Sequence, residues 1–131
     1  MPPEESHYAR DWLRVAERDW RRLGQALDDG DAEEAGFWLQ QAVEKYLKAS
    51  LLSKGWRLRK VHDLELLVNE AAAYMPDFAR YARACRKISG YYIIERYPMM
   101  DPPSLTVEEI ARSRDEVLGL VESIQQEWGR G

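Results

Sequence analysis

The stretch DAEEAGFWLQQAVEKYLKASLLSKGWRLRK, from Asp31 to Lys60, decides the fold of this chain. It begins with Asp31 and, three residues later, Glu34, an acidic variant of the capping box that marks helix starts. Inward-facing residues then recur every three or four positions until Gly55, which predicts an amphipathic helix ending near Lys54. The expected inward face consists of Ala35, Leu39, Ala42, Val43, Tyr46, Leu47, Ser50 and Leu51.

The second half of this stretch is strongly basic. No acidic residue follows Glu44 in it, yet six cations fall within sixteen positions of a chain whose formal net charge is −4. A cationic helix end suits the helix dipole, which accounts for part of the pattern. A second cluster without acids follows at 80–87. The cations are Lys45, Lys48, Lys54, Arg57, Arg59 and Lys60, then Arg80, Arg83, Arg86 and Lys87. They form either two solvated faces or one pocket for phosphate.

Length and composition predict one soluble domain spanning residues 1–131. Hydrophobic residues make up 45% and charged residues 32%, which is typical of a globular helical protein. No apolar run approaches the roughly 18 residues that a membrane span requires. The start, Met1 to Glu5, lacks both the positive charge and the apolar stretch of a signal peptide, so we expect a cytoplasmic protein.

Cysteine and histidine are scarce in this chain. Cys85 is the single cysteine, which rules out a disulfide within the chain, and a packed, reduced thiol is the expected state. The only histidines are His7 and His62. Because so few cysteine and histidine side chains are available to bind a transition metal, we expect no metal site and no cofactor.

Two further helix patterns flank the central stretch. From Ser6 to Asp29 the apolar residues again recur every three or four positions. Because only a short connection joins this helix to the next, the two should pack antiparallel. The last helix should begin after Thr106, which forms a capping box with Glu109. Its expected apolar face is Val107, Ile110, Ala111, Val117, Leu118, Val121, Ile124 and Trp128.

Between these helices the pattern is less regular. A short helix should begin near Leu64, with Leu66, Leu67, Ala71 and Tyr74 inward, and Pro76 suits the first turn of a fourth helix that reaches about Tyr92. We expect an irregular segment from Tyr91 to Pro98, since proline disfavours helix at the preceding residue. The predicted fold is all-α, an up-and-down bundle of four main helices plus one short helix.

Two groups of residues offer chemistry beside the basic clusters. His62 beside Asp63 would suit a general base tuned by a carboxylate, or a helix cap with a hydrogen-bonded imidazole, and the cap is the preferred interpretation. Tyr91, Tyr92, Arg96 and Tyr97 have the ring and guanidinium planes that stack on a base and hold its phosphate, or else they close the core or a subunit contact.

A set of short motifs in fixed order carries a family resemblance. The motifs are Gln40-Gln41-Ala42-Val43-Glu44-Lys45-Tyr46-Leu47-Lys48-Ala49, Gly55, His62-Asp63-Leu64, Tyr92 and Arg96-Tyr97-Pro98. Together they resemble the HEPN domain family of prokaryotic small proteins, from Asp11 to about Trp128. The resemblance implies a bundle similar to the helical domain that accompanies nucleotidyltransferases, dimerisation, and nucleotide or RNA binding. It also implies pairing with a minimal nucleotidyltransferase encoded next door, as in toxin–antitoxin systems.

Many HEPN proteins are metal-independent endoribonucleases that use an Arg, four to six intervening residues and a His on a late helix, paired across a dimer. In this sequence Arg86 is followed at that spacing by Tyr91 instead of His. Because the ordinary pKa of tyrosine is about 10, Tyr91 is a poor general base at neutral pH. The resemblance therefore favours binding over cleavage. Arg57 and His62 show the same spacing, but they lie in a loop between early helices.

The leading prediction is a non-catalytic nucleotide-binding module that acts as a homodimer and partners a minimal nucleotidyltransferase. The predicted phosphate or base contacts are Lys45, Lys48, Arg57, Arg86, Tyr92, Arg96 and Tyr97. One alternative is a ribonuclease toxin with a displaced site that uses Arg86 and His62. The other is a helical protein-interaction subunit that pairs through its tryptophans, which are Trp12, Trp20, Trp38, Trp56 and Trp128.

Overall fold

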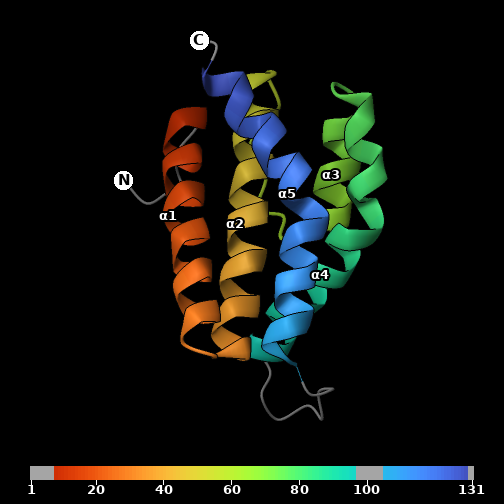
Figure 1. The fold of residues 1–131 in the computed structure, drawn as a ribbon. Helices are drawn as coiled ribbons and strands as arrows, with labels where there is room; N and C mark the ends of the chain where they lie inside the picture. Colours follow the sequence, from red (N-terminus) through yellow and green to blue (C-terminus); the bar gives the residue numbers. More distant parts are fainter. Residues whose placement is uncertain (1–7, 97–104, 130–131) are drawn as a thin grey trace.

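The computed structural model describes residues 8–96 and 105–129, and every regular element in these residues is a helix. The elements are α1 (Ala9–Asp28), α2 (Ala32–Ser53), α3 (Leu64–Ala72), the short 3-10 helix η2 (Pro76–Tyr81), α4 (Ala82–Arg96) and α5 (Val107–Gly129). The predicted all-α bundle of four long helices and one short helix is confirmed (Figure 1). No helix of the described residues is both long and apolar enough to cross a membrane.

Helices α1 and α2 form an antiparallel hairpin, as the short connection predicted (Figure 1). Gly30 makes the turn with a φ of 74°, a left-handed conformation that glycine adopts without a Cβ penalty. Asp31 then caps α2, because its carboxylate accepts a hydrogen bond from the backbone N–H of Glu34 at 3.1 Å. The predicted cap by Asp31 is thus present and marks the start of α2, while the N–H of Asp31 donates to the carbonyl of Ala26 rather than to Glu34.

Helix α2 is the central element of the bundle. It contacts α1, α3, α4 and α5, and all residues from 42 to 51 are buried. Ten consecutive buried residues span almost three turns, so the helix is enclosed on every side rather than along one stripe. The polar residues of that run are consequently inside the molecule, among them Glu44, Lys45 and Lys48.

Helix α4 continues to Arg96, although we expected an irregular segment from Tyr91 onward. Tyr91 is held in the core, where its hydroxyl lies 2.9 Å from that of Ser113. Gly36 leaves room for this packing, since a Cβ there would lie 3.3 Å from both Tyr91 Cβ and Ile110 Cδ1. The core contacts of Tyr91 favour helix at that position, and α4 ends at Arg96, directly before the residue at which Pro98 disfavours helix.

Three residues predicted to face inward are exposed. Leu66, Tyr74 and Leu118 are 41%, 47% and 40% accessible. On α5 the buried face includes Leu120, which the sequence interpretation did not include. Neighbouring helical positions point about 100° apart, so packing through Val117, Leu120 and Ile124 turns Leu118 outward.

Candidate functional site

A buried carboxylate, that of Glu44 on α2, organises one side of the molecule. Its two oxygens accept hydrogen bonds from Gln40 Nε2 at 3.0 Å and Lys48 Nζ at 3.0 Å, and His62 Nδ1 lies 3.1 Å from each. Glu44 and Lys48 are 2% and 3% exposed in their side chains. Burial raises the pKa of Glu44, but Lys48, Lys45 and His62 outweigh it, and the pKa lies below its usual value.

A second buried carboxylate, that of Asp19 on α1, lies in a different setting. Arg18 Nε is 3.2 Å from its Oδ1 and Arg22 Nη1 is 4.0 Å away, and both guanidinium groups are about half exposed. Lys45 on α2 also attracts it. Burial dominates over these cations and raises the pKa of Asp19. Lys45 itself donates a hydrogen bond to Gln41 Oε1 at 2.7 Å.

The basic loop between α2 and α3, residues 54–63, is attached to the bundle at two points. At its start, Trp56 Nε1 donates to Glu70 on α3 at 3.0 Å, and Arg59 pairs with the same carboxylate. At its end, the His62 ring bonds Glu44, and Gln40 Nε2 donates to the His62 carbonyl at 3.4 Å. The loop is therefore held in one arrangement before any ligand arrives.

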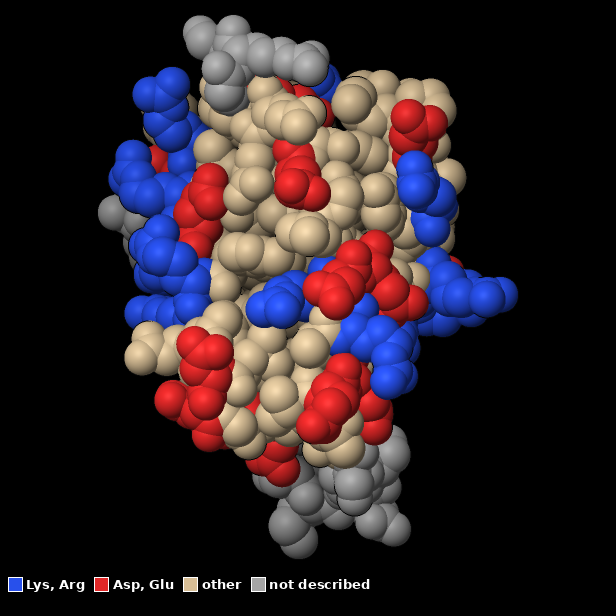
Figure 2. All heavy atoms as spheres, viewed as in Figure 1, with Lys and Arg blue, Asp and Glu red and all other residues tan. Residues whose placement is uncertain are grey.

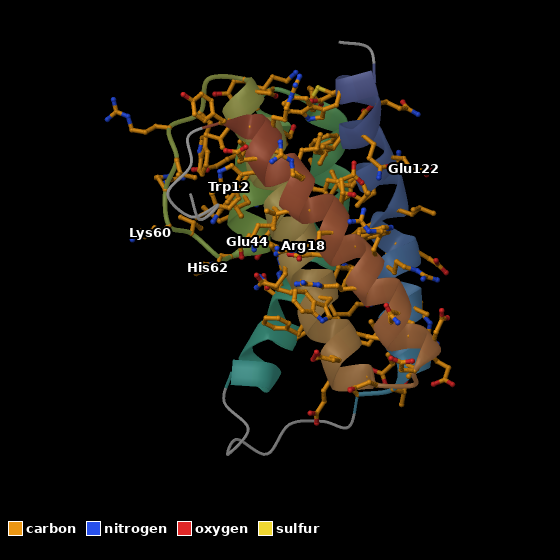
Figure 3. All side chains as sticks on the ribbon, turned by 90° about the vertical axis from the view of Figure 1, so that its left-hand side faces the viewer. Trp12, Arg18, Glu44, Lys60, His62 and Glu122 are labelled. Carbon is orange, nitrogen blue, oxygen red and sulfur yellow. The ribbon has the colours of Figure 1, made fainter. Side chains whose placement is uncertain are left out.

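A small pocket lies between this loop and the α1–α2 hairpin. It has a volume of about 130 Å³ and is lined by Trp12, Lys48, Leu58, Arg59, Lys60 and His62, and we name it the loop pocket. Lys48 Nζ is 5.1 Å from the centre of the Trp12 ring. Figure 3 shows Trp12, Glu44, His62 and Lys60 on the same side of α1. An aromatic wall with four cationic or imidazole groups suits a small anion such as phosphate.

Of the predicted site residues whose side chains the structure describes, only Lys48 and His62 line this pocket. Lys45 is on the same helix but is 6% exposed and faces Asp19. Arg57 is exposed in the loop, outside the pocket lining. Arg86 is on α4, where it binds Glu65 through its Nε at 3.0 Å.

The predicted tyrosine-rich segment lies where the first described range, residues 8–96, ends. Tyr91 is a core residue bonded to Ser113, so it does not present its hydroxyl to solvent at the spacing where HEPN nucleases have His. Tyr97 lies outside the described residues, as do the side chains of Tyr92 and Arg96.

The preferred interpretation of His62 and Asp63, a helix cap with a hydrogen-bonded imidazole, is confirmed. Asp63 is the cap of α3, since its carboxylate accepts hydrogen bonds from the backbone N–H groups of Glu65 and Leu66 at 3.0 and 3.2 Å. The hydrogen-bonded imidazole was predicted, but its partner is Glu44, eighteen residues earlier. Long-range pairing of this kind carries no signal in a local sequence pattern.

The sequence interpretation missed the arginines of α1. Five of them are exposed, namely Arg10, Arg14, Arg18, Arg21 and Arg22. In Figure 2 the Lys and Arg atoms gather along the side of the molecule formed by α1. Their regular spacing of three or four residues was visible in the sequence and was the available signal.

The comparison with protein families agrees with this architecture. The model of the HEPN domain matches residues 9–125. The chain belongs to the HEPN family. A solved structure, TT1696 from Thermus thermophilus, resembles this HEPN chain with a TM-score of 0.77 and 27% sequence identity, covering 90% of this chain and 96% of that one. Curated proteins give no match.

The tryptophans of this HEPN chain pack mostly into the bundle. Trp12 is 1% exposed, and Trp20, Trp38, Trp56 and Trp128 are partly buried against the core. The large exposed apolar residues of the described part are instead Tyr8, Leu66, Tyr74 and Leu118. A protein contact of this chain would therefore use those residues more than the tryptophans.

Proposed function

We propose that this HEPN chain is a non-catalytic nucleotide-binding module that holds a phosphate group in the loop pocket. The observation that carries the proposal is the pocket lining, in which Lys48, Arg59, Lys60 and His62 surround a space of about 130 Å³ beside Trp12. Lys48 is neutralised by Glu44 and Arg59 by Glu70, whereas Lys60 is exposed and has no ion-pair partner among the described residues. Lys60 is therefore the principal phosphate contact.

The test measures the affinity for AMP and ATP by isothermal titration calorimetry. Lys60→Gln should weaken binding about fivefold to tenfold, as expected for the loss of roughly 1 kcal/mol. Arg57→Gln is the matched control, because Arg57 is exposed in the same loop but does not line the pocket, and it should change the affinity less than about twofold. Absence of heat at millimolar AMP, ATP and inorganic phosphate would refute the proposal.

Metal-independent RNA cleavage is a second candidate, favoured by one contact. His62 is 55% exposed in its side chain and is oriented by the buried Glu44, the arrangement that a general base requires. In that case His62→Gln should abolish cleavage of transfer RNA in the presence of EDTA. The same assay with Arg86→Gln tests whether cleavage also requires Arg86, the other residue predicted for a ribonuclease. Intact RNA after incubation with the wild-type protein would dismiss this candidate.

Family membership supports two further parts of the proposal, a homodimer and a minimal nucleotidyltransferase partner of the toxin–antitoxin type. Leu66 and Tyr74 add exposed apolar surface near α3 that suits a protein contact. Light scattering after size exclusion measures the mass, and twice 15.3 kDa is the expected value. A mass of one chain would contradict the homodimer. The cytoplasmic location and the contacts of Tyr92, Arg96 and Tyr97 stay predictions.

A further inference from the structure

Two cation–π contacts join α1 and α2 near the two ends of the hairpin, and the helix that supplies the cation is exchanged between them. At one end Lys48 of α2 lies over the Trp12 ring of α1, and at the other Arg22 of α1 lies over the Trp38 ring of α2 at 4.7 Å. The two contacts are ten residues apart on each helix, which corresponds to about 15 Å along the axis. Between them Arg18 lies one turn before Arg22 on α1 and Lys45 lies two turns after Trp38 on α2, and we name this part of the hairpin the charged seam.

The far end of the seam has its own hollow, which we name the turn pocket. Its volume is about 270 Å³, twice that of the loop pocket, and Arg22 and Trp38 line it. Gln25 and Ala26 also line it, together with three carboxylates at the α1–α2 turn, those of Asp29, Asp31 and Glu34. Acceptors of this kind disfavour phosphate but accept hydrogen bonds from the amino groups of a nucleobase. The exposed guanidinium of Arg22 offers a plane on which a base stacks.

The loop pocket and the turn pocket differ in size and charge, so they suit the two different ends of one ligand. The loop pocket is too small for a whole nucleotide, since pockets that enclose drug-sized ligands measure roughly 300–1,000 Å³. It admits a phosphate group, and the turn pocket admits a base. Arg18, half exposed between them, is placed to meet a second phosphate. Figure 3 labels Arg18 on α1, near Glu44 of the neighbouring α2.

We propose that the ligand spans the charged seam, with a terminal phosphate in the loop pocket and an amino-bearing base in the turn pocket about 15 Å away. This inference rests on the proposed phosphate binding and narrows its substrate class. A mononucleotide is too short to reach both pockets. A small dinucleotide and the phosphorylated end of an oligonucleotide share the required chemistry.

The test compares affinities by calorimetry for a series of adenine compounds. The probes are AMP, 5′-phosphorylated diadenylate, diadenylate without the terminal phosphate, and 5′-phosphorylated diuridylate. The phosphorylated diadenylate should bind at least about tenfold tighter than AMP and than the unphosphorylated compound, and several-fold tighter than the uridylate, as gained base contacts imply. Equal affinity for AMP and phosphorylated diadenylate would overturn the inference and leave the proposed function intact. No binding of AMP, ATP or inorganic phosphate would instead refute the proposed function.

Neighbouring arginines supply a matched pair of variants. Arg22→Gln should lower the affinity for phosphorylated diadenylate to about that for AMP, whereas Arg21→Gln, on the outward face of α1, should leave it within about twofold. Glu34 is exposed, and Glu34→Gln should reduce the preference for adenine over uracil even if Arg22→Gln unfolds the protein. An unchanged affinity in both Arg22→Gln and Glu34→Gln would overturn the inference.

A longer probe distinguishes a small dinucleotide from the phosphorylated end of an oligonucleotide. If 5′-phosphorylated hexaadenylate binds more than about threefold tighter than the diadenylate, the ligand is the end of an oligonucleotide that continues beyond the turn pocket. Equal affinities identify a small dinucleotide. Either result supports a ligand that spans the seam, while weaker binding of the hexamer than of AMP would contradict it.

Discussion

Asp19 and Glu44 are both buried carboxylates on the α1–α2 hairpin, yet their surroundings shift their pKa values in opposite directions. Asp19 is 1% exposed and Glu44 2%, so burial disfavours the charged form of each. The cation bonded to Glu44, Lys48, is buried with it, whereas the arginines bonded to Asp19 are half exposed. A cation shielded from water interacts more strongly with its partner than one that water solvates.

The comparison separates an ion pair enclosed in the bundle from one whose cations reach solvent. Glu44 holds Lys48, Gln40 and the His62 loop, so it shapes the loop pocket. Asp19 leaves Arg18 and Arg22 about half exposed, as the ligand proposed along the seam requires. The lysine paired with Glu44 and the arginines paired with Asp19 therefore differ in their exposure to water.

The largest effect is expected from removing Glu44. Glu44→Ala leaves the ammonium of Lys48 buried and unpaired, so the free energy of unfolding should fall by about 3–5 kcal/mol. Urea denaturation measures the loss. As a control, Glu44→Leu combined with Lys48→Met replaces the pair by apolar groups and should restore most of the stability. A loss under about 1 kcal/mol for Glu44→Ala would mean that Lys48 reaches water, and the contrast with Asp19 would vanish.

This burial explains where the sequence interpretation succeeded and where it failed. The capping motifs of Asp31 and Thr106 are local and are present, with Thr106 Oγ1 accepting from the Glu109 N–H at 3.1 Å. Helix type and order follow from such signals. Lys45 and Lys48 were assigned to a surface because lysine is rarely buried. Their burial depends on α2 being enclosed by four other helices, which no periodicity within α2 encodes.

The candidate site was only partly predictable for the same reason. Lys48 and His62 were chosen from charge and motif, and they line the loop pocket. Trp12 was one of five tryptophans considered for a protein contact, and Lys60 was only one member of a basic cluster, so their meeting at the pocket depends on how the loop folds back. The loop is positioned by Glu70 and Glu44, whose contacts with Trp56 and His62 cross fourteen and eighteen residues.

A smaller effect is expected from pH. The two carboxylates should change the free energy of unfolding with opposite signs as the pH falls. The folded-state pKa of Glu44 lies below 4.5, so its contribution is present above pH 4.5 and is lost as the pH falls through the folded-state value. The pKa of Asp19 is raised above 3.8, so its contribution is present below pH 3.8 and is lost as the pH rises.

Urea denaturation between pH 7 and pH 3 measures both signs. Relative to the wild type, Glu44→Gln should lose less stability on acidification, because it no longer carries a carboxylate with a lowered pKa. Asp19→Asn should lose more, because the offsetting contribution of Asp19 is gone. Parallel curves for all three proteins would contradict the opposite shifts.

The smallest effect should come from Asp19→Asn at neutral pH. The substitution removes a charge whose neutral form burial favours, and the asparagine oxygen still accepts a hydrogen bond from Arg18. Arg18 and Arg22 are about half exposed, so water solvates them when the carboxylate is gone. The free energy of unfolding should therefore change by less than about 1 kcal/mol.

A loss above about 2 kcal/mol would show that Lys45 depends on Asp19 as Lys48 depends on Glu44, because an uncompensated buried ammonium is costly. In that case both carboxylates would be structural, and the arginines of the seam would be held in place rather than available to a ligand.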